Sequence, residues 1–222
     1  MYMMKNIRTG YEWRTSLNDN LEKNTKDIII DVMHSITAVG SDFEEYPDKY
    51  LTESDARCFL FNEFMRNHSF NRVSRTQDNS QSIPVHTEVR WYGNEEEKLK
   101  YRSDMVIIET ADLITQGKIF KLPSKGFAFN RFNAIIEIKL RRSNGERDGN
   151  FIKKIKYDVE KLIKIEKEVA KADILEYALF IFILDKKNKN GSMYNLINGK
   201  FFGIKKKYYP IRDLFICYFA SA

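Results

Sequence analysis

Residues 132–142 read FNAIIEIKLRR, and this stretch decides the fold class. Its run of branched and aromatic residues predicts a strand that is buried on both faces. Glu137 and Lys139 nevertheless stand in the middle of the run, although Lys and Glu are rarely fully buried and an unpaired buried charge is costly. Alternate residues of a strand share one face, so both side chains project on the same side. We therefore expect them to complement each other and a further charged group.

The segments around this strand predict an α/β fold with a mixed sheet. Helical periodicity, strand alternation and turn residues give the order helix, three strands, helix, strand. Thr52 is the expected N-cap of the first helix. The apolar face of that helix would comprise Ala56, Phe59, Leu60 and Phe64. The expected ranges of the six elements are 51–67, 83–92, 103–109, 132–140, 151–170 and 177–185.

Further elements are expected on both sides of this core. A helical spacing of apolar residues runs from Ser16 to Val39, with Gly40 just past its end, and predicts one helix or two that break near Thr25. Near the other end, Asn198-Gly199 predicts a hairpin within SMYNLINGKFFGI, residues 192–204, and a closing strand follows in 210–219. Without repeats or a long low-complexity linker, residues 1–222 read as a single domain. We divide it into a helical extension, a core and C-terminal strands, spanning 1–45, 51–185 and 186–222.

The composition favours a polyanionic partner. The net charge is +6, and Lys and Arg recur in clusters along the chain, although a biased base composition would also produce many lysines. Cys58 and Cys217 are too few for a disulfide framework and are expected to be reduced and buried. No apolar run approaches the roughly 20 residues that span a bilayer, and the first residues lack a signal-peptide core. We therefore expect a cytoplasmic protein without a membrane partner.

A second carboxylate points to a metal. Asp104 begins the apolar run MVII on the preceding strand, where it could lie beside Glu137. Two carboxylates in a dry cleft repel each other unless a cation lies between them, and oxygen ligands of this kind suit Mg²⁺. The ammonium of Lys139 could then orient an attacking water and offset charge on a transferring phosphorus.

Asp104 followed by Glu137-Ile138-Lys139, with a helix beginning at Glu53 and a helix carrying Lys156 and Asp158, resembles the PD-(D/E)XK nuclease superfamily. This resemblance covers about residues 51–185 and implies a restriction-endonuclease-like αβββαβ core. It implies that Asp104, Glu137 and the carbonyl of Ile138 are metal ligands, and that Lys139 is the catalytic lysine. The sequence departs from the family in Ser103, where a proline often precedes the aspartate, and in a long excursion across 110–131.

The same resemblance suggests roles for other acidic residues. Glu53, or Glu63 in its place, would be the carboxylate that many members carry on the first helix; Glu53 could equally be a dipole partner of its helix. Glu88 could join the metal shell directly or through water, although its strand also fits a solvent-facing pattern.

The implied activity is that of a DNA endonuclease or exonuclease of the restriction or DNA repair type, which hydrolyses phosphodiester bonds with Mg²⁺, for which Mn²⁺ could substitute. Lys156, Arg141 and His86 are candidate substrate contacts, while snorkelling and a structural hydrogen bond are the ordinary roles of such a Lys and His. A homodimer is compatible with the superfamily. The alternatives are a catalytically silent DNA-binding or assembly module on this fold, and a metal hydrolase acting on RNA or nucleotides.

Overall fold

A six-stranded mixed sheet forms the centre of the protein in the computed structural model, which describes residues 2–5, 23–92, 99–115, 129, 131–170, 177–187, 192–197 and 214–221. The strand order is β1-β8-β7-β6-β5-β4, parallel from β1 to β6 and antiparallel from β6 to β4. The strands are β1 (Tyr2–Lys5), β4 (Val85–Tyr92), β5 (Leu99–Ile108), β6 (Phe132–Arg141), β7 (Ala178–Asp185) and β8 (Leu214–Ala220).

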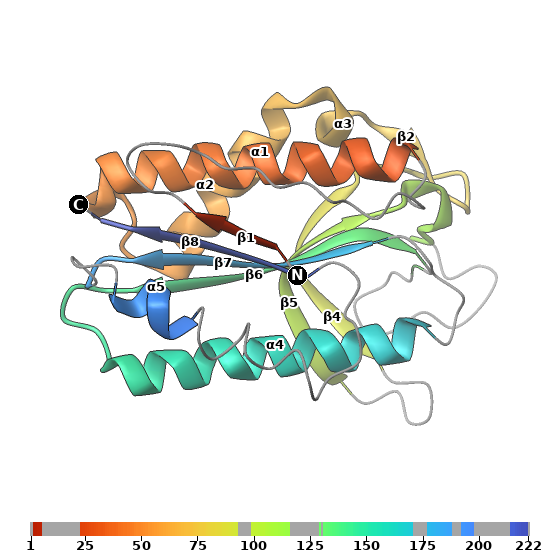
Figure 1. Cartoon of the computed structure of the whole chain (residues 1–222). Coiled ribbons are helices and arrows are strands. Elements are labelled where there is room, and N and C mark those ends of the chain that lie inside the picture. The colour runs from red at the N-terminus through yellow and green to blue at the C-terminus, as the bar shows by residue number, and fades with distance from the viewer. Residues whose placement is uncertain are drawn as a thin grey trace.

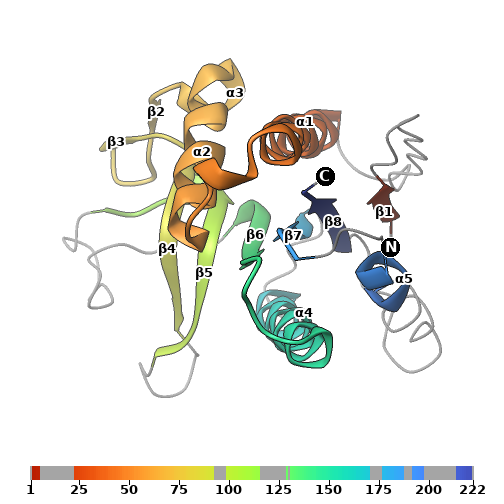
Figure 2. The same cartoon turned by 90° about the vertical axis from the view of Figure 1, so that its left-hand side faces the viewer.

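Helices cover both faces of this sheet (Figures 1 and 2). One face carries α1 (Lys23–Glu45), α2 (Glu53–Arg66) and the short α3 (His68–Asn71). The opposite face carries α4 (Asp148–Ala170) and α5 (Ser192–Ile197). Two 3₁₀ turns, Pro47–Lys49 and Thr110–Asp112, and a small two-stranded sheet of β2 (Ser74–Arg75) and β3 (Gln81–Ser82) complete the described elements.

The predicted α/β class and mixed sheet are confirmed. α2, β4, β5, β6, α4 and β7 follow one another in the expected order of helix, three strands, helix, strand. Thr52 caps α2 as expected: its hydroxyl accepts a hydrogen bond from the backbone N–H of Asp55, and the Asp55 carboxylate accepts one from the N–H of Thr52. This capping box fixes the start of α2, whose first residue is Glu53.

The first long helix does not end before Gly40 as predicted but continues to Glu45. Gly40 is needed there for close packing rather than for a helix stop, because a Cβ at this position would overlap the ring of Phe219 in β8. The helix start predicted at Ser16 lies outside the described residues. The segment expected to be a helical extension thus provides β1, which pairs with β8, and a helix that packs against the sheet.

The predicted hairpin near the C-terminus is wrong in its first half, because residues 192–197 form α5. Met193 and Ile197, one helical turn apart, are both buried in the core on the α4 face, and this contact overrides the local turn signal. Asn198-Gly199 lies outside the described residues. The closing strand is confirmed as β8, which lies between β7 and β1.

Two expectations about α2 also need correction. Phe59 is exposed rather than part of the buried face, although its ring contacts that of Tyr50; Ala56, Leu60 and Phe64 are buried as expected. Cys58 is exposed, whereas Cys217 is buried. Among the described helices, none has an apolar stretch long enough to cross a bilayer.

Candidate active site

β5 and β6 pair along only part of their length, and the candidate site lies where they separate. The last paired residues in this direction are Met105 and Ile136. Extending the antiparallel register by one residue places Asp104 of β5 opposite Glu137 of β6. Beyond this point β4 and β5 turn away from β6, β7 and β8 (Figure 1). The predicted proximity of the two acidic residues therefore follows from the strand register.

Two carboxylates take over the backbone hydrogen bonds that β5 no longer provides. Oδ2 of Asp104 accepts a hydrogen bond from the N–H of Ile138 at 2.8 Å. Oε1 of Glu53, at the start of α2, accepts one from the N–H of Leu140 at 3.4 Å. A buried peptide N–H needs a partner, so the separating strands hold both acidic side chains against β6.

Glu137 is buried, with only 1% of the residue exposed, and it projects towards α4. Its Oε2 accepts a hydrogen bond from Nζ of Lys161 at 2.6 Å. Its Oε1 is buried and has no hydrogen-bond partner among the described residues. Burial raises the pKa of Glu137 to about 8. The positive charge of Lys161 lowers this pKa, but the negative charges of Asp104 and Asp158 raise it. This oxygen could therefore bind a cation as a ligand, or carry the proton of the neutral carboxyl group.

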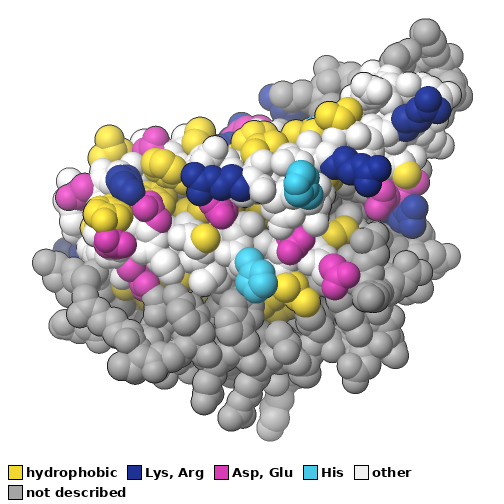
Figure 3. Space-filling model, turned by 90° about the horizontal axis from the view of Figure 1, so that it is seen from above, with side chains coloured by type: hydrophobic (Ala, Val, Ile, Leu, Met, Phe, Trp, Pro, Cys, Tyr) yellow, Lys and Arg dark blue, Asp and Glu magenta, His cyan; other side chains and the backbone are white. Residues whose placement is uncertain are grey.

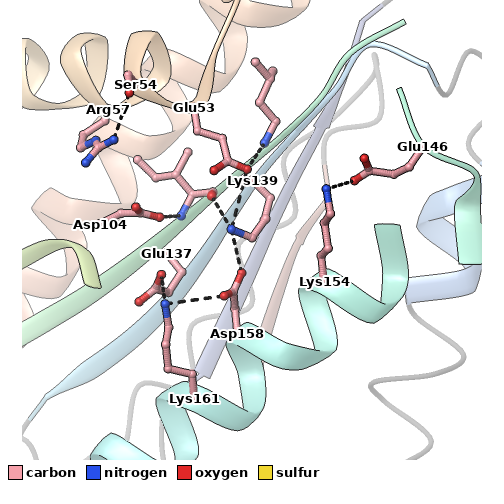
Figure 4. A network of polar contacts seen from close by, with 12 residues as sticks. Glu53, Ser54, Arg57, Asp104, Glu137, Lys139, Glu146, Lys154, Asp158 and Lys161 are labelled. Carbon is pink, nitrogen blue, oxygen red and sulfur yellow. Dashed lines mark hydrogen bonds and ion pairs between the residues drawn. The ribbon is translucent and has the colours of Figure 1, made fainter. Parts of the chain in front are cut away.

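Lys139 lies on the same face of β6, as the sequence predicted, and is held by three oxygen atoms (Figure 4). Its Nζ is 3.0 Å from Oδ2 of Asp158 and 3.7 Å from Oε1 of Glu53, and it donates a hydrogen bond to the carbonyl of Ile138 at 3.2 Å. Burial alone lowers the pKa of Lys139, but the carboxylates of Asp158 and Glu53 raise it, and the net shift is upward. The side chain therefore remains a charged ammonium at neutral pH.

Lys161, on α4, is the residue of this cluster that the sequence analysis missed. Lys161 also donates a hydrogen bond to the carbonyl of Arg102 at 3.0 Å and lies 3.6 Å from Oδ1 of Asp158. Asp158 is thereby shared by the two lysines. The sequence does indicate that Asp158 lies on the buried face of α4, because it is three residues after Ile155 and four before Leu162, which are both buried. Lys161 follows that stripe at a position where a lysine ordinarily snorkels to solvent.

The cluster has a formal charge that suits a divalent cation. Four carboxylates and two ammoniums leave a charge of minus two when all are ionised: Asp104, Glu137, Glu53 and Asp158 with Lys139 and Lys161. In the described parts of the chain no three His, Cys, Asp or Glu side chains converge as metal ligands. The donors that fit a hard cation are the carboxylates of Asp104 and Glu137 and the carbonyl of Ile138.

Thr87 and Val89, on either side of Glu88, pair with Met105 and Ser103 of β5, which places Glu88 opposite Asp104. Glu88 nevertheless makes different contacts. Its carboxylate forms ion pairs with Arg57 of α2 and, at 2.7 Å, with Arg102 of β5. Its backbone φ is 56°, in the left-handed region that non-glycine residues rarely adopt. In this arrangement the carboxylate of Glu88 neutralises two arginines. It does not provide a metal-ligating oxygen beside Asp104 and Glu137.

Arg141 does not have the exposed position expected of a substrate contact. It is 2% exposed, and its guanidinium forms two hydrogen bonds to Asp185, at 2.8 and 2.5 Å, and one to Asp148 at 2.6 Å. The group also lies over the ring of Phe151, and the hydroxyl of Tyr218 donates to Asp185. These contacts join the ends of β6 and β7 to the start of α4, so we infer a structural role for Arg141.

The remaining candidates lie outside the cluster. His86 is partly buried beside Ser82, and burial lowers the pKa of its imidazole. Lys156 points to solvent and lies 3.6 Å from Glu160 of the same helix. Glu63 pairs with an arginine one turn along α2, so Glu53 is the carboxylate of α2 that reaches Lys139.

Comparison with known proteins gives no match to this chain, whether by family model, by curated sequence or by solved structure. The interpretation of the site therefore depends on its own geometry and charge.

Proposed function

We propose that this protein is a metal-dependent nuclease that hydrolyses phosphodiester bonds of DNA, built on a restriction-endonuclease-like core of the PD-(D/E)XK type. One observation carries the proposal. Asp104 and Glu137 come together where β5 leaves β6, with the partly buried ammonium of Lys139 beside the backbone carbonyl of Ile138. The buried, unpartnered Oε1 of Glu137 supports a cation at this point.

Asp104, Glu137 and the carbonyl of Ile138 would hold Mg²⁺, or Mn²⁺ in its place. When bound, the ion would neutralise negative charge that develops on the phosphate oxygens. Lys139 carries a positive charge on the same side of β6 and would stabilise the same developing charge. Glu53 and Asp158 hold its ammonium in position. Hydrolysis would add water across the P–O3′ bond and leave a 5′-phosphate and a 3′-hydroxyl.

The net charge of +6 supports a nucleic-acid substrate. Basic side chains are not gathered into one patch on the face that carries α1, α2 and α3, where Figure 3 shows them interspersed with acidic ones. We infer that DNA approaches the point where the strands separate rather than this helical face. We propose restriction or DNA repair in the cytoplasm as the setting, with a homodimer as one way to cut both strands.

The test is cleavage of a panel of linear, supercoiled, branched and single-stranded DNA in Mg²⁺, in Mn²⁺ and in EDTA. Glu137→Gln preserves shape and removes the charge, so we expect it to abolish metal-dependent cutting. Glu63→Gln is the matched control on an ion-paired carboxylate outside the cluster. Cutting that persists in EDTA, or an active Glu137→Gln protein, would refute the proposal, and faster cleavage of RNA than of DNA would favour the RNA-processing alternative.

A second function is favoured by the contact between Lys161 and Glu137. Because an ammonium already neutralises Glu137, the same fold could act as a DNA-binding or assembly module without catalysis. Salt-sensitive DNA binding without cleavage on any member of the panel would support this alternative.

A further inference from the structure

Two arginines pair with one glutamate beside the candidate active site, and a third arginine lies opposite one of them. Arg57 of α2 and Arg102 of β5 are both ion-paired to Glu88 of β4. Arg90 of β4 lies directly opposite Arg102 in the antiparallel register, and such neighbours have Cβ atoms about 4.5–5.5 Å apart on the same face. We call Arg57, Arg90 and Arg102 the arginine cluster.

Among the described residues, the arginine cluster carries more positive charge than its ion-pair partner Glu88 neutralises. Three guanidiniums and one carboxylate leave a formal charge of plus two. Like charges that lie directly opposite each other on two strands destabilise the pair. In addition, Nε of Arg90 is buried and has no hydrogen-bond partner among the described residues. An anion bound between the guanidiniums would remove the repulsion.

The backbone of β4 is distorted at the same place. Val85 packs into the core on the α1 and α2 side, whereas Val89 packs into the core on the α4 side. Residues four apart on a regular strand share a face, so the strand reverses its faces between them. The reversal coincides with the left-handed φ of 56° at Glu88. Residues held in this region of backbone space cluster at ligand-binding and catalytic sites.

We propose that the arginine cluster binds a phosphate group of the DNA backbone next to the phosphodiester at the active site. Guanidinium groups bind phosphate through paired hydrogen bonds, so arginine suits this ligand better than any other residue type does. Arg102 is two residues from Asp104, and its carbonyl accepts the hydrogen bond from Lys161, so the two sites share one segment of β5. Glu88 holds the guanidiniums in place until the phosphate arrives. This inference rests on the proposed function.

The test measures binding separately from cleavage. A fluorescein-labelled DNA duplex is titrated in EDTA at several KCl concentrations, and its anisotropy gives the dissociation constant and its salt dependence. Arg102 is 58% exposed, so Arg102→Gln should fold normally. Arg66→Gln is the matched control, since Arg66 is also an exposed, glutamate-paired arginine of the chain. Far-ultraviolet circular dichroism verifies folding of each variant.

We expect Arg102→Gln and Arg90→Gln to weaken binding and to lower the slope of log K against log salt by about 0.9 for each DNA phosphate that the variant no longer neutralises. Arg66→Gln should leave the slope unchanged, and Glu88→Gln should tighten binding because it removes the competing carboxylate. Unchanged affinity and slope in both arginine variants would overturn the proposal.

The same proteins assayed with Mg²⁺ distinguish the two claims. If wild type cuts DNA but the arginine variants bind and cut equally well, the arginine cluster is not a phosphate site and the nuclease proposal survives. If the arginine variants lose affinity while wild type never cuts DNA, the phosphate site is supported and the nuclease proposal fails.

Discussion

Nζ of Lys161 lies 2.6 Å from Oε2 of Glu137, and both side chains are nearly inaccessible to solvent. The helix α4 thus provides the counter-charge that allows a glutamate to stand in the buried strand β6. The other oxygen of Glu137 remains without a partner in the described structure. This relationship explains how the fold tolerates an acidic side chain in a buried strand.

Replacing Lys161 with methionine should destabilise the protein by about 3–5 kcal/mol, because it leaves the buried carboxylate of Glu137 without its cation. Urea unfolding in EDTA at about pH 9, above the pKa of about 8 at which Glu137 ionises in the folded protein, measures the loss. Lys154→Met is the matched control: Lys154 is also on α4 and pairs with Glu146 at 2.8 Å, but it is 58% exposed, so its loss should cost below about 1 kcal/mol. Equal costs for the two variants would show that the contact of Lys161 with Glu137 is not a buried ion pair.

The raised pKa of Glu137 predicts a pH dependence of stability in the absence of metal. Its carboxyl has a pKa of about 8 in the folded protein against 4.5 for the unfolded chain, so the folded state binds the proton more tightly. The free energy of unfolding should therefore fall as pH rises from 4.5 to 8, with a limiting slope of about 1.4 kcal/mol per pH unit from this group. Urea unfolding across this range should show a smaller fall for Glu137→Gln than for wild type. Parallel profiles would contradict the assignment.

A cation should stabilise the protein through the same carboxylates. At a concentration about 100-fold above its dissociation constant, Mn²⁺ would add about 2.7 kcal/mol to the free energy of unfolding. Asp104→Asn should abolish this gain, since the amide oxygen can still accept the hydrogen bond from the N–H of Ile138 but carries no charge. Differential scanning calorimetry with and without Mn²⁺ measures it. Asp112→Asn is the control, and an unchanged Mn²⁺ effect in Asp104→Asn would exclude Asp104 as a ligand.

Asp158 is expected to position Lys139 rather than to contact substrate. Asp158→Asn removes the closest carboxylate of Lys139, at 3.0 Å, so we predict a fall in the cleavage rate constant of about tenfold or more, equivalent to about 1.4 kcal/mol of barrier. The dissociation constant for DNA in EDTA should not change. Glu160→Gln, on the same helix and ion-paired to an exposed lysine, is the control. A change in DNA affinity with an unchanged rate constant would reverse this assignment.

Arg141→Lys tests whether that arginine is structural. Lysine keeps the charge but cannot make the two hydrogen bonds to Asp185, so the protein should lose about 3 kcal/mol of stability while its affinity for DNA remains that of wild type. Thermal unfolding and the anisotropy titration measure the two quantities on one sample. Reduced affinity in a protein of normal stability would restore Arg141 as a substrate contact.

The sequence predicted those elements in which the spacing of apolar residues shows by itself that the element is buried. β6 and β7 are continuous apolar runs, and α2 has a capping box at its start, so each could be located from local residues. The prediction of a hairpin at 192–204 was wrong in its first half. The turn signal carries no information about the burial of Met193 and Ile197 against distant parts of the core. Local chemistry predicted structure correctly where no distant contact opposed it.

The site was predictable to the extent that strand neighbours define it. Glu137 and Lys139 share a face by alternation, and Asp104 follows from the strand order. Lys161 could not be found in this way, because its role depends on how α4 lies across β6. The left-handed backbone of Glu88 was equally hidden, since glutamate gives no signal for it.

The rate of cleavage of an end-labelled DNA duplex at saturating Mg²⁺ measures whether Lys139 serves phosphodiester hydrolysis. This role of Lys139 predicts that wild type cuts, that Lys139→Met loses at least about 100-fold in rate, or about 2.7 kcal/mol of barrier, while still binding the duplex, and that Lys154→Met cuts normally. A Lys139→Met protein that folds and cuts at the wild-type rate, or a wild type that cuts no DNA with any divalent cation, would contradict it.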